Sequence, residues 1–193
     1  MQKYLLLIVI GYVLGSIPFS YIVGKLLNNI DIREHGSGNA GATNAFRVLG
    51  VKGGLLAFIG DFIKGAIAVI IGRLLFGLNG GLLTGLFAVI GHCYPFTLKF
   101  RGGKGVATTA GIIIAVNPLM GLLLIAFEFS IIFITRYVSL ASILSAFAFP
   151  ILSYLFGMEK NFIFLSVFLA LFVIYRHRTN LKRLLNGNEK KIK

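Results

Sequence analysis

The chain has 193 residues, of which 57% are hydrophobic and only 13% are charged, and its mean hydropathy is +0.90. These values exclude an ordinary soluble domain, which is about half apolar and a quarter charged, and they indicate an integral membrane protein. The net charge of +13 is better explained by the positive-inside rule of membrane proteins, or by binding of an anionic ligand or lipid surface, than by binding of nucleic acid. The reason is that the basic residues flank apolar runs. Cys93 is the single cysteine, so we expect no intrachain disulfide and no thiolate metal cluster. Three histidines and few carboxylates give little support to another metal site, and we expect no cofactor.

Apolar runs follow one another along the chain, and we interpret them as about seven transmembrane helices, some short or broken, in one all-α domain over residues 1–193. They lie at about 4–24, 53–78, 82–98, 105–116, 119–135, 138–157 and 161–176. The first run is interpreted as a retained span rather than a cleaved signal peptide. The fourth run is shorter than the roughly 20 residues that cross a bilayer, so a short span and a half-helix both stay open. Asn117-Pro118 predicts a tight turn into the fifth run.

The basic residues are distributed unequally between the connections. Most of them lie in 25–52, in 99–104, at Arg136 and in the tail that follows the last run, whereas the opposite side holds only Lys3 and Lys160. The positive-inside rule therefore predicts an external N-terminus and a cytoplasmic C-terminus. This orientation places every glycine-rich or polar connection on the cytoplasmic side.

The sequence HGSGNAGATNAFR at 35–47 follows the first apolar run and consists of small and polar residues closed by an arginine. Gly38 and Gly41 permit positive φ and close approach of the backbone to a ligand. Successive small residues can turn several N–H groups inward and form an anion-binding nest. The side chains that add donors to this nest are those of Ser37, Thr43 and Asn44.

A helix is expected to begin near Ala45, directly after this nest. Thr43 or Asn44 is a candidate for its N-cap, and the N-terminus of a helix favours an anion. Arg47 would then face a phosphate bidentately. The alternative is a flexible loop with an ordinary cap, and from this segment alone the two interpretations have equal weight.

A second glycine-rich segment, GHCYPFTLKFRGGKGVATTAG, covers residues 91–111. It contains, in order, His92, Gly102, Gly103, Lys104, Gly105, Thr108 and Thr109. This order again combines a glycine nest, a cation and hydroxyls in front of a helix. It is not a Walker A loop, because Leu98 and Gly105 stand where that motif needs glycine and Ser or Thr. His92 lies near the membrane surface, and a structural histidine is the alternative to a functional one.

Two pairs of polar residues occur later in the chain. Ser139 and Ser142 are three residues apart, as are His177 and Asn180, so each pair shares one face of a helix. The alternative for each pair is a polar helix end without function. The basic residues expected to anchor the tail to anionic lipid headgroups are Arg176, Arg178, Lys182 and Arg183.

Three ionisable residues lie inside apolar runs, where a charge suggests function. Asp61 and Lys64 are three residues apart and can neutralise one another, so a functional and a structural role have equal weight. Glu128 has no evident partner in the sequence. A buried protonated carboxyl and a water-facing carboxylate both stay open for it.

Taken together, these segments resemble a known family. SGNAGATNAFR, GHCYPFTLKFRGGKGVAT and YRHRTNLKRLLNG are similar to the three signature blocks of the bacterial acylphosphate-dependent glycerol-3-phosphate acyltransferases, the PlsY family. The resemblance runs from the first apolar run to the tail, and the combined blocks are more specific than any one of them. It implies a multi-span enzyme of the bacterial inner membrane whose active site faces the cytoplasm.

The resemblance implies the first acylation step of phospholipid synthesis. A fatty acyl group would pass from acyl phosphate to the 1-hydroxyl of sn-glycerol 3-phosphate, giving lysophosphatidic acid and phosphate, with residues 37–44 binding the acyl phosphate. The catalytic candidates are Ser37, Arg47, His92 and Lys104. The substrate-binding candidates are Gly38, Asn39, Gly41, Ala42, Thr43, Asn44, Gly102, Gly103, Gly105, Thr108, Ser139, Ser142, His177 and Asn180.

An acyl phosphate is already activated, so we expect direct transfer through positioning and charge stabilisation rather than a covalent intermediate on Ser37. The attacking hydroxyl loses its proton to His92 or to a phosphate oxygen of the substrate. We favour the phosphate, because the sequence near His92 contains no carboxylate that would orient the ring.

The expected partners are the two substrates and membrane lipids, without nucleic acid, and the chain is taken to be a monomer. The alternative function is a transporter or flippase for phosphorylated metabolites or lipids. Alternating access needs polar groups on both sides of the membrane. The predicted external connections are plain turns, which counts against a transporter.

Overall fold

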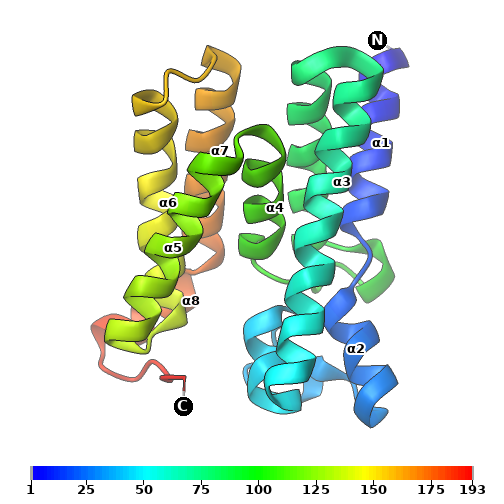
Figure 1. Ribbon diagram of the computed structural model, residues 1–193. Helices are drawn as coiled ribbons and strands as arrows, with labels where there is room; N and C mark the ends of the chain where they lie inside the picture. Colours follow the sequence, from blue (N-terminus) through cyan, green and yellow to red (C-terminus); the bar gives the residue numbers. More distant parts are fainter. Residues whose placement is uncertain (1, 193) are drawn as a thin grey trace. The chain divides into compact units, whose positions relative to one another are not determined.

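The computed structural model describes residues 2–192, and all of their regular secondary structure is helical (Figure 1). The chain divides into two compact units, one ending at Val116 and the other beginning at Asn117. The all-α fold expected from the sequence is therefore confirmed. The single domain expected over the whole chain stays a prediction.

The first unit contains the helices that come before Asn117. They are α1 (Gln2–Gly15), α2 (Phe19–Asn28), the 3₁₀ helix η1 (Ile32–Glu34), α3 (Ala42–Cys93), the 3₁₀ helix η2 (Phe96–Leu98) and α4 (Val106–Val116). The apolar run predicted at 4–24 is interrupted between α1 and α2. Pro18 precedes α2, and a proline has no backbone N–H with which to continue a helix.

Helix α3 is not one continuous rod. Its backbone leaves helical geometry at Gly50, with φ 72°, and at Gly77, with φ 66°, and glycine adopts these angles without steric cost. The result is three helical segments, 42–49, 51–75 and 78–93. Figure 1 shows the chain turning back on itself within α3, and a Cβ added at Gly72 would meet the carbonyl oxygen of Gly80. The predicted runs at 53–78 and 82–98 therefore fall on two neighbouring legs of α3.

Glycines let the helices of the first unit approach closely. A Cβ added at Gly15 of α1 would meet the carbonyl oxygen of Ala88 in α3, and one at Gly111 of α4 would meet that of Phe62. Helix α4 has 11 residues, about 16 Å at the helical rise, which is short of the roughly 30 Å of a hydrocarbon core.

The second unit contains α5 (Pro118–Thr135), α6 (Val138–Leu155), α7 (Lys160–Arg176) and α8 (Arg178–Leu185). The turn predicted at Asn117-Pro118 is confirmed: Asn117 caps α5, and its Oδ1 accepts the Met120 N–H at 3.0 Å. Phe149 of α6 and Phe162 of α7 pack edge to face, with ring centroids 5.7 Å apart. Helices α7 and α8 meet at a bend of 59°.

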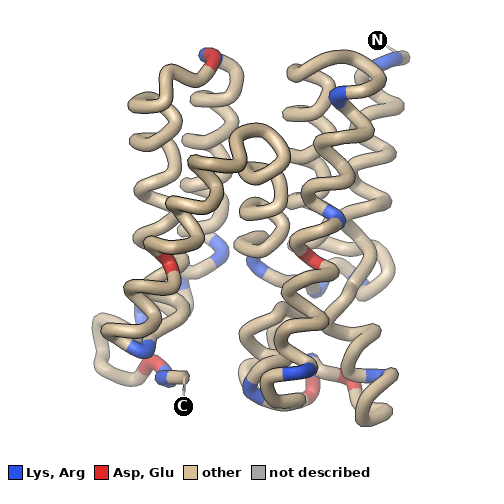
Figure 2. The backbone as a smooth tube through the Cα atoms, viewed as in Figure 1, with Lys and Arg blue, Asp and Glu red and all other residues tan. Residues whose placement is uncertain are grey.

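Within the described residues, four helical stretches are long and apolar enough to cross a membrane, or five if the bent pair α7 and α8 counts as one span. Figure 2 shows that Lys, Arg, Asp and Glu gather toward helix ends in each unit, with few in the middle of the helices. The chain is thus an all-α membrane protein. The predicted number of about seven spans and the predicted orientation stay predictions.

Candidate functional site

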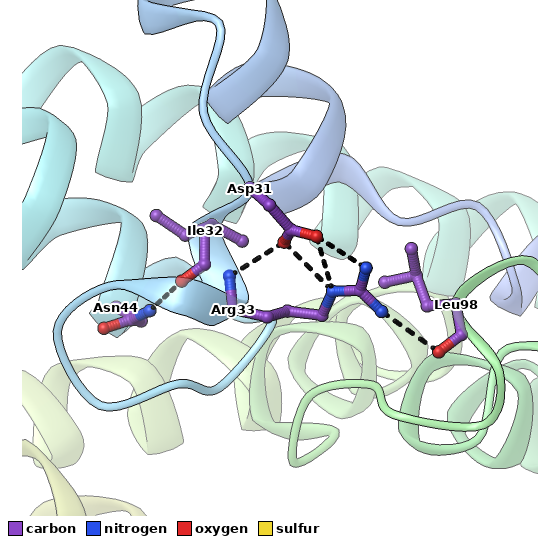
Figure 3. A network of polar contacts seen from close by, with 5 residues as sticks. All are labelled: Asp31, Ile32, Arg33, Asn44 and Leu98. Carbon is purple, nitrogen blue, oxygen red and sulfur yellow. Dashed lines mark hydrogen bonds and ion pairs between the residues drawn. The ribbon is translucent and has the colours of Figure 1, made fainter.

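The loop before α3, residues 35–41, is the first glycine loop, and it closes around the side chain of Asn44. Asn44 is only 1% exposed, and its Oδ1 accepts the Ser37 N–H at 2.7 Å. Its Nδ2 donates to the carbonyl oxygens of Ile32 and His35 at 2.9 and 3.0 Å (Figure 3 draws the first of these). Both amide hydrogens are therefore used by the protein, so Asn44 shapes the loop instead of offering them to a ligand.

The start of α3 differs from the prediction. The helix begins at Ala42 rather than near Ala45, and Gly41, not Thr43 or Asn44, is its N-cap. The prediction was wrong because it required a side-chain cap, whereas Asn44 is engaged with the preceding loop. The N–H groups of Ala42 and Thr43 open the helix, where backbone donors have no intrahelical partner. Thr43 and Arg47 are four residues apart and share a face of this first segment.

The glycines of the first glycine loop have different backbone geometries. Gly38 has φ 72°, so the positive angle expected there is confirmed. Gly41 is extended, with φ −149°, so it does not use the positive angle that glycine permits. Asn39 is half-buried between them, while Ser37 and Gly38 are exposed.

An ion pair beneath the first glycine loop was not predicted. Arg33 donates from Nε and Nη2 to Asp31, with 2.6 Å between Nη2 and Oδ2, and from Nη1 to the Leu98 carbonyl oxygen at 3.2 Å (Figure 3). The hydrogen bond from Arg33 lowers the pKa of Asp31 below its usual range. Arg33 thus joins the helix η1 before the first glycine loop to the helix η2 before the second glycine loop, residues 99–105.

The two glycine loops meet at Gly103. A Cβ added at Gly103 would lie 2.9 Å from the Ala40 carbonyl oxygen, and one at Gly41 would lie 3.9 Å from the Cα of Gly103. The second loop is also pinned to the end of α3. The N–H groups of Gly102 and Gly103 donate to the carbonyl oxygens of Cys93 and His92 at 3.3 and 3.1 Å.

The predicted cationic and hydroxyl groups belong to the second loop and to the helices that follow the two loops. Arg47 and Lys104 are half-buried, and Gly105 has φ 90° before α4 begins. Thr108 is fully buried, and its hydroxyl has no hydrogen-bond partner among the described residues. The structure brings these residues into one unit, and their substrate contacts stay predictions.

His92 has a carboxylate beside it that the sequence did not reveal. Its Nδ1 lies 3.3 Å from Oδ1 of Asp61, and the same oxygen lies 2.8 Å from Nζ of Lys64. The predicted pairing of Asp61 with Lys64 is confirmed. The expectation that no carboxylate orients His92 was wrong, because Asp61 belongs to another leg of α3 that only the reversal at Gly77 brings alongside.

In the second unit, Ser142 and Glu128 form a pair. The Ser142 hydroxyl donates to Oε1 of Glu128 at 2.8 Å, so the carboxyl that lacked a partner in the sequence has one. Because a hydroxyl has a single hydrogen, Ser142 keeps only acceptor capacity toward a ligand.

Glu189 accepts hydrogen bonds from two other predicted polar residues of this unit, Ser139 and Asn180, and from Arg183. It accepts from Ser139 Oγ at 2.8 Å, from Asn180 Nδ2 at 2.6 Å and from Arg183 Nε at 2.6 Å. Burial alone would raise the pKa of Glu189, but hydrogen bonds from Arg183, Asn180 and Ser139 outweigh it and lower the pKa below its usual range. No pattern in the sequence singled out Glu189, since it follows the last helix in a charged tail.

His177 lies at the bend between α7 and α8. It is buried, and its Nδ1 lies 2.8 Å from the Val173 carbonyl oxygen. Its predicted partner Asn180 is also buried, on the first turn of α8. Within residues 2–192, no three His, Cys, Asp or Glu side chains are grouped to hold a metal ion.

Comparison with known proteins gives a consistent picture. A family model described as glycerol-3-phosphate acyltransferase matches residues 5–187. The chain is 46% identical over 188 residues to the glycerol-3-phosphate acyltransferase of Bacillus subtilis, covering 97% of each protein. It is 46% identical over 184 residues to that of a Thermoanaerobacter species, covering 95% of this chain and 93% of the relative.

Solved structures with high similarity are of an integral membrane glycerol 3-phosphate acyltransferase, PlsY. Its glycerol 3-phosphate form superposes with a TM-score of 0.93 at 41% identity, covering 98% of this chain and 96% of the other. Its lysophosphatidic acid form gives a TM-score of 0.92 at 41% identity, covering 98% and 95%.

Proposed function

This chain belongs to the glycerol-3-phosphate acyltransferase family, and on that premise we propose that it transfers a fatty acyl group from acyl phosphate to the 1-hydroxyl of sn-glycerol 3-phosphate. The products are 1-acyl-glycerol 3-phosphate and inorganic phosphate. The relatives are named acyltransferases, and one of them has structures with glycerol 3-phosphate and with lysophosphatidic acid. A transporter or flippase finds no support among them.

The observation that carries this proposal is the meeting of the two glycine loops at Gly103. Both reactants are phosphates, and backbone N–H groups beside Arg47 and Lys104 suit two anionic groups. The first glycine loop and the start of α3 bind the acyl phosphate, and the second glycine loop contributes Lys104 to the phosphates. The acyl tail lies against the apolar helices.

In the second unit, we assign Ser142, His177 and Asn180 to the glycerol 3-phosphate. Ser142 offers a hydroxyl oxygen as acceptor, because its hydrogen is directed to Glu128. A group of that kind suits a glycerol hydroxyl better than a phosphate oxygen, since phosphate oxygens need donors. Asn180 and Ser139 are held in place by Glu189.

The reaction needs positioning and charge stabilisation more than covalent catalysis. The attacking hydroxyl adds to the acyl carbonyl, phosphate leaves, and its charge is stabilised by Arg47, Lys104 and backbone N–H groups. Well-oriented reactants can gain roughly 7–11 kcal/mol from proximity alone. The transfer is direct, and Ser37 contributes binding rather than an acyl-enzyme.

The proton of the attacking hydroxyl passes to a phosphate oxygen of the substrate. The support for this choice is steric: a Cβ added at Gly103 would overlap Nε2 of His92, so that nitrogen faces the backbone of the second glycine loop. The other ring nitrogen faces Asp61. Each ring nitrogen therefore already has a protein neighbour, which favours the substrate phosphate as the acceptor of the proton.

The base assignment is tested with His92→Gln. We expect the acid limb of the kcat profile, which reflects substrate phosphate with a pKa near about 6, to remain in the variant even if kcat falls. If the acid limb disappears and kcat falls by about 10²-fold or more, His92 is the base. Mass spectrometry of the quenched wild-type enzyme is expected to detect no acyl group on Ser37.

The activity is tested with the purified full chain, labelled glycerol 3-phosphate and palmitoyl phosphate. We expect lysophosphatidic acid and phosphate in equal amounts, and Lys104→Gln to lower kcat by about 10²-fold or more, since it removes a cation that stabilises the leaving group. Lys99→Gln is the matched control, because Lys99 is an exposed lysine of the same loop. Uptake of glycerol 3-phosphate into vesicles without product would instead favour the transporter.

The proposed setting is the bacterial inner membrane, with a monomeric chain, an external N-terminus and an active site that faces the cytoplasm. The support is the unequal distribution of Lys and Arg. The legs of α3 at 51–75 and 78–93, together with α1, α4, α5, α6 and α7, supply about seven spans. Basic residues of α8 contact anionic headgroups.

A further inference from the structure

A buried charged network, formed by Lys64, Asp61 and His92, connects the break between α1 and α2 with the second glycine loop. The three residues are 3%, 1% and 6% exposed. Lys64 Nζ lies 2.8 Å from Oδ1 of Asp61 and donates to the Ile17 carbonyl oxygen at 2.7 Å. The Asp61 oxygens have no hydrogen-bond partner in the described chain apart from their two charged neighbours.

The network gives His92 a fixed orientation. A carboxylate at Nδ1 selects the tautomer with its hydrogen on Nδ1, which leaves Nε2 as an acceptor on the opposite side of the ring. That side faces Gly103, whose N–H also donates to the His92 carbonyl oxygen at 3.1 Å. The main chain of His92 therefore binds Gly103, which precedes Lys104 and borders Ala40, and its ring packs against the same residue.

We propose that Asp61 and Lys64 are positioning residues. They hold His92 in the orientation that supports the second glycine loop, and they thereby fix the position of Lys104 relative to the first glycine loop. The inference rests on the proposed function, in which these loops bind phosphate. It assigns the intramembrane charges a task in substrate binding rather than in proton transfer.

The choice of charged residues at this position supports the proposal. Two charges in a low-dielectric setting pay a desolvation penalty, and apolar residues of similar volume often stabilise a fold as well or better. Apolar replacements would fill the same space but would give the imidazole no directional partner. A lysine that reaches both Asp61 and the Ile17 carbonyl also keeps the carboxylate itself in one place.

The experiment compares the wild type with the double variant Asp61→Asn/Lys64→Met, which removes both charges and avoids a buried unpaired one. Inorganic phosphate, a product, is titrated while the unfolding temperature is followed. We expect the phosphate-induced shift of the wild type to be lost in the variant, and KM for glycerol 3-phosphate or palmitoyl phosphate to rise at least tenfold. The pH dependence of kcat is expected to stay unchanged.

Thr84→Val is the matched control, because Thr84 is a fully buried polar residue of α3 that bonds only within its own helix, to Gly80. It is expected to keep both the phosphate shift and KM. Should the double variant not fold, Asp61→Glu is measured instead. It keeps both charges but displaces the carboxylate, and we expect amide exchange in 99–105 at least tenfold faster than in the wild type.

Three results would overturn the proposal: a double variant with wild-type phosphate shift and KM, a loss confined to kcat with an altered acid limb, or unchanged amide exchange in Asp61→Glu. Failure of the proposed function is a separate observation, namely wild-type protein that makes no lysophosphatidic acid. The phosphate shift and amide exchange can still be compared in that case, because neither requires turnover.

Discussion

The side chain of Asn44 makes three hydrogen bonds to the backbone of the residues that precede α3. Its amide satisfies one N–H and two carbonyl groups of residues 32–37. Asp61 faces both His92 and Lys64, and Glu128 accepts a hydrogen bond from Ser142. In each unit, polar side chains that the sequence singled out are thus oriented by a second polar group behind them.

Asn44→Ala is expected to lower activity more than tenfold and to speed amide exchange across 33–41. Each hydrogen bond lost is worth about 0.5–1.5 kcal/mol, so the loop loses the conformation that presents its backbone N–H groups. The check is a pair of measurements, initial rates and hydrogen exchange, on folded protein. Asn28→Ala, at an exposed position at the end of α2, should change neither, and equal effects from both variants would contradict this role.

At the scale of elements, Glu189 fastens the tail of the chain to two helices. It joins Ser139 at the start of α6 to Asn180 and Arg183 in α8. Elsewhere, contacts between helices depend on small residues, as at Gly111 of α4 against α3. Within the units, connecting segments are therefore held by polar contacts, whereas neighbouring helices pack through glycine.

Glu189→Gln is expected to lower the unfolding temperature at neutral pH and to matter less in acid. The pKa of Glu189 is lowered in the folded protein, so its contribution is fully present above the unfolded pKa of about 4.3. It is lost as the pH falls through the lower folded-state value.

Thermal unfolding of the wild type and of Glu189→Gln, measured between about pH 7 and about pH 3, checks this pH dependence. The difference between the two proteins should be constant down to about pH 5 and shrink below it. Glu159→Gln, an exposed carboxyl outside this cluster, should show little difference at any pH. A difference that widens on acidification would reverse the sign and refute the assignment.

The distribution of positive charge predicts how the molecule is oriented in the membrane. The cytoplasmic assignment of both glycine loops follows from it, because the connections that contain them also contain most of the basic residues. In the predicted orientation, the proposed acyl phosphate would reach the loops from the membrane and glycerol 3-phosphate from the cytoplasm.

The orientation is tested by cysteine labelling in intact cells with a maleimide that does not cross the membrane. Cys93 is completely buried, so it contributes no background. A cysteine at the exposed position of Lys160 should react in intact cells, whereas Lys182→Cys should react only after permeabilisation. The reverse pattern would place the glycine loops outside.

The apolar runs and the helical fold were predictable from local sequence, but the break before α2 and the reversal within α3 were not. Long apolar runs form helices in a membrane because no other partner is available for their backbone groups. Glycine, lysine and arginine beside one another indicate anion binding whatever their surroundings. The start of α3 was wrong, because Asn44 is a good N-cap in isolation and its use by the preceding loop is a tertiary contact.

Composition and spacing thus predicted an all-α membrane protein, which the structure confirms, and the residues within two loops that we propose bind phosphate. Only the tertiary structure decided which groups stand behind those residues. Asp61 reaches His92 because α3 reverses at Gly77, and Glu189 reaches Ser139 because the tail returns to α6. Such contacts depend on the path of the chain between distant residues, and the local patterns of composition and spacing in one sequence do not contain that path.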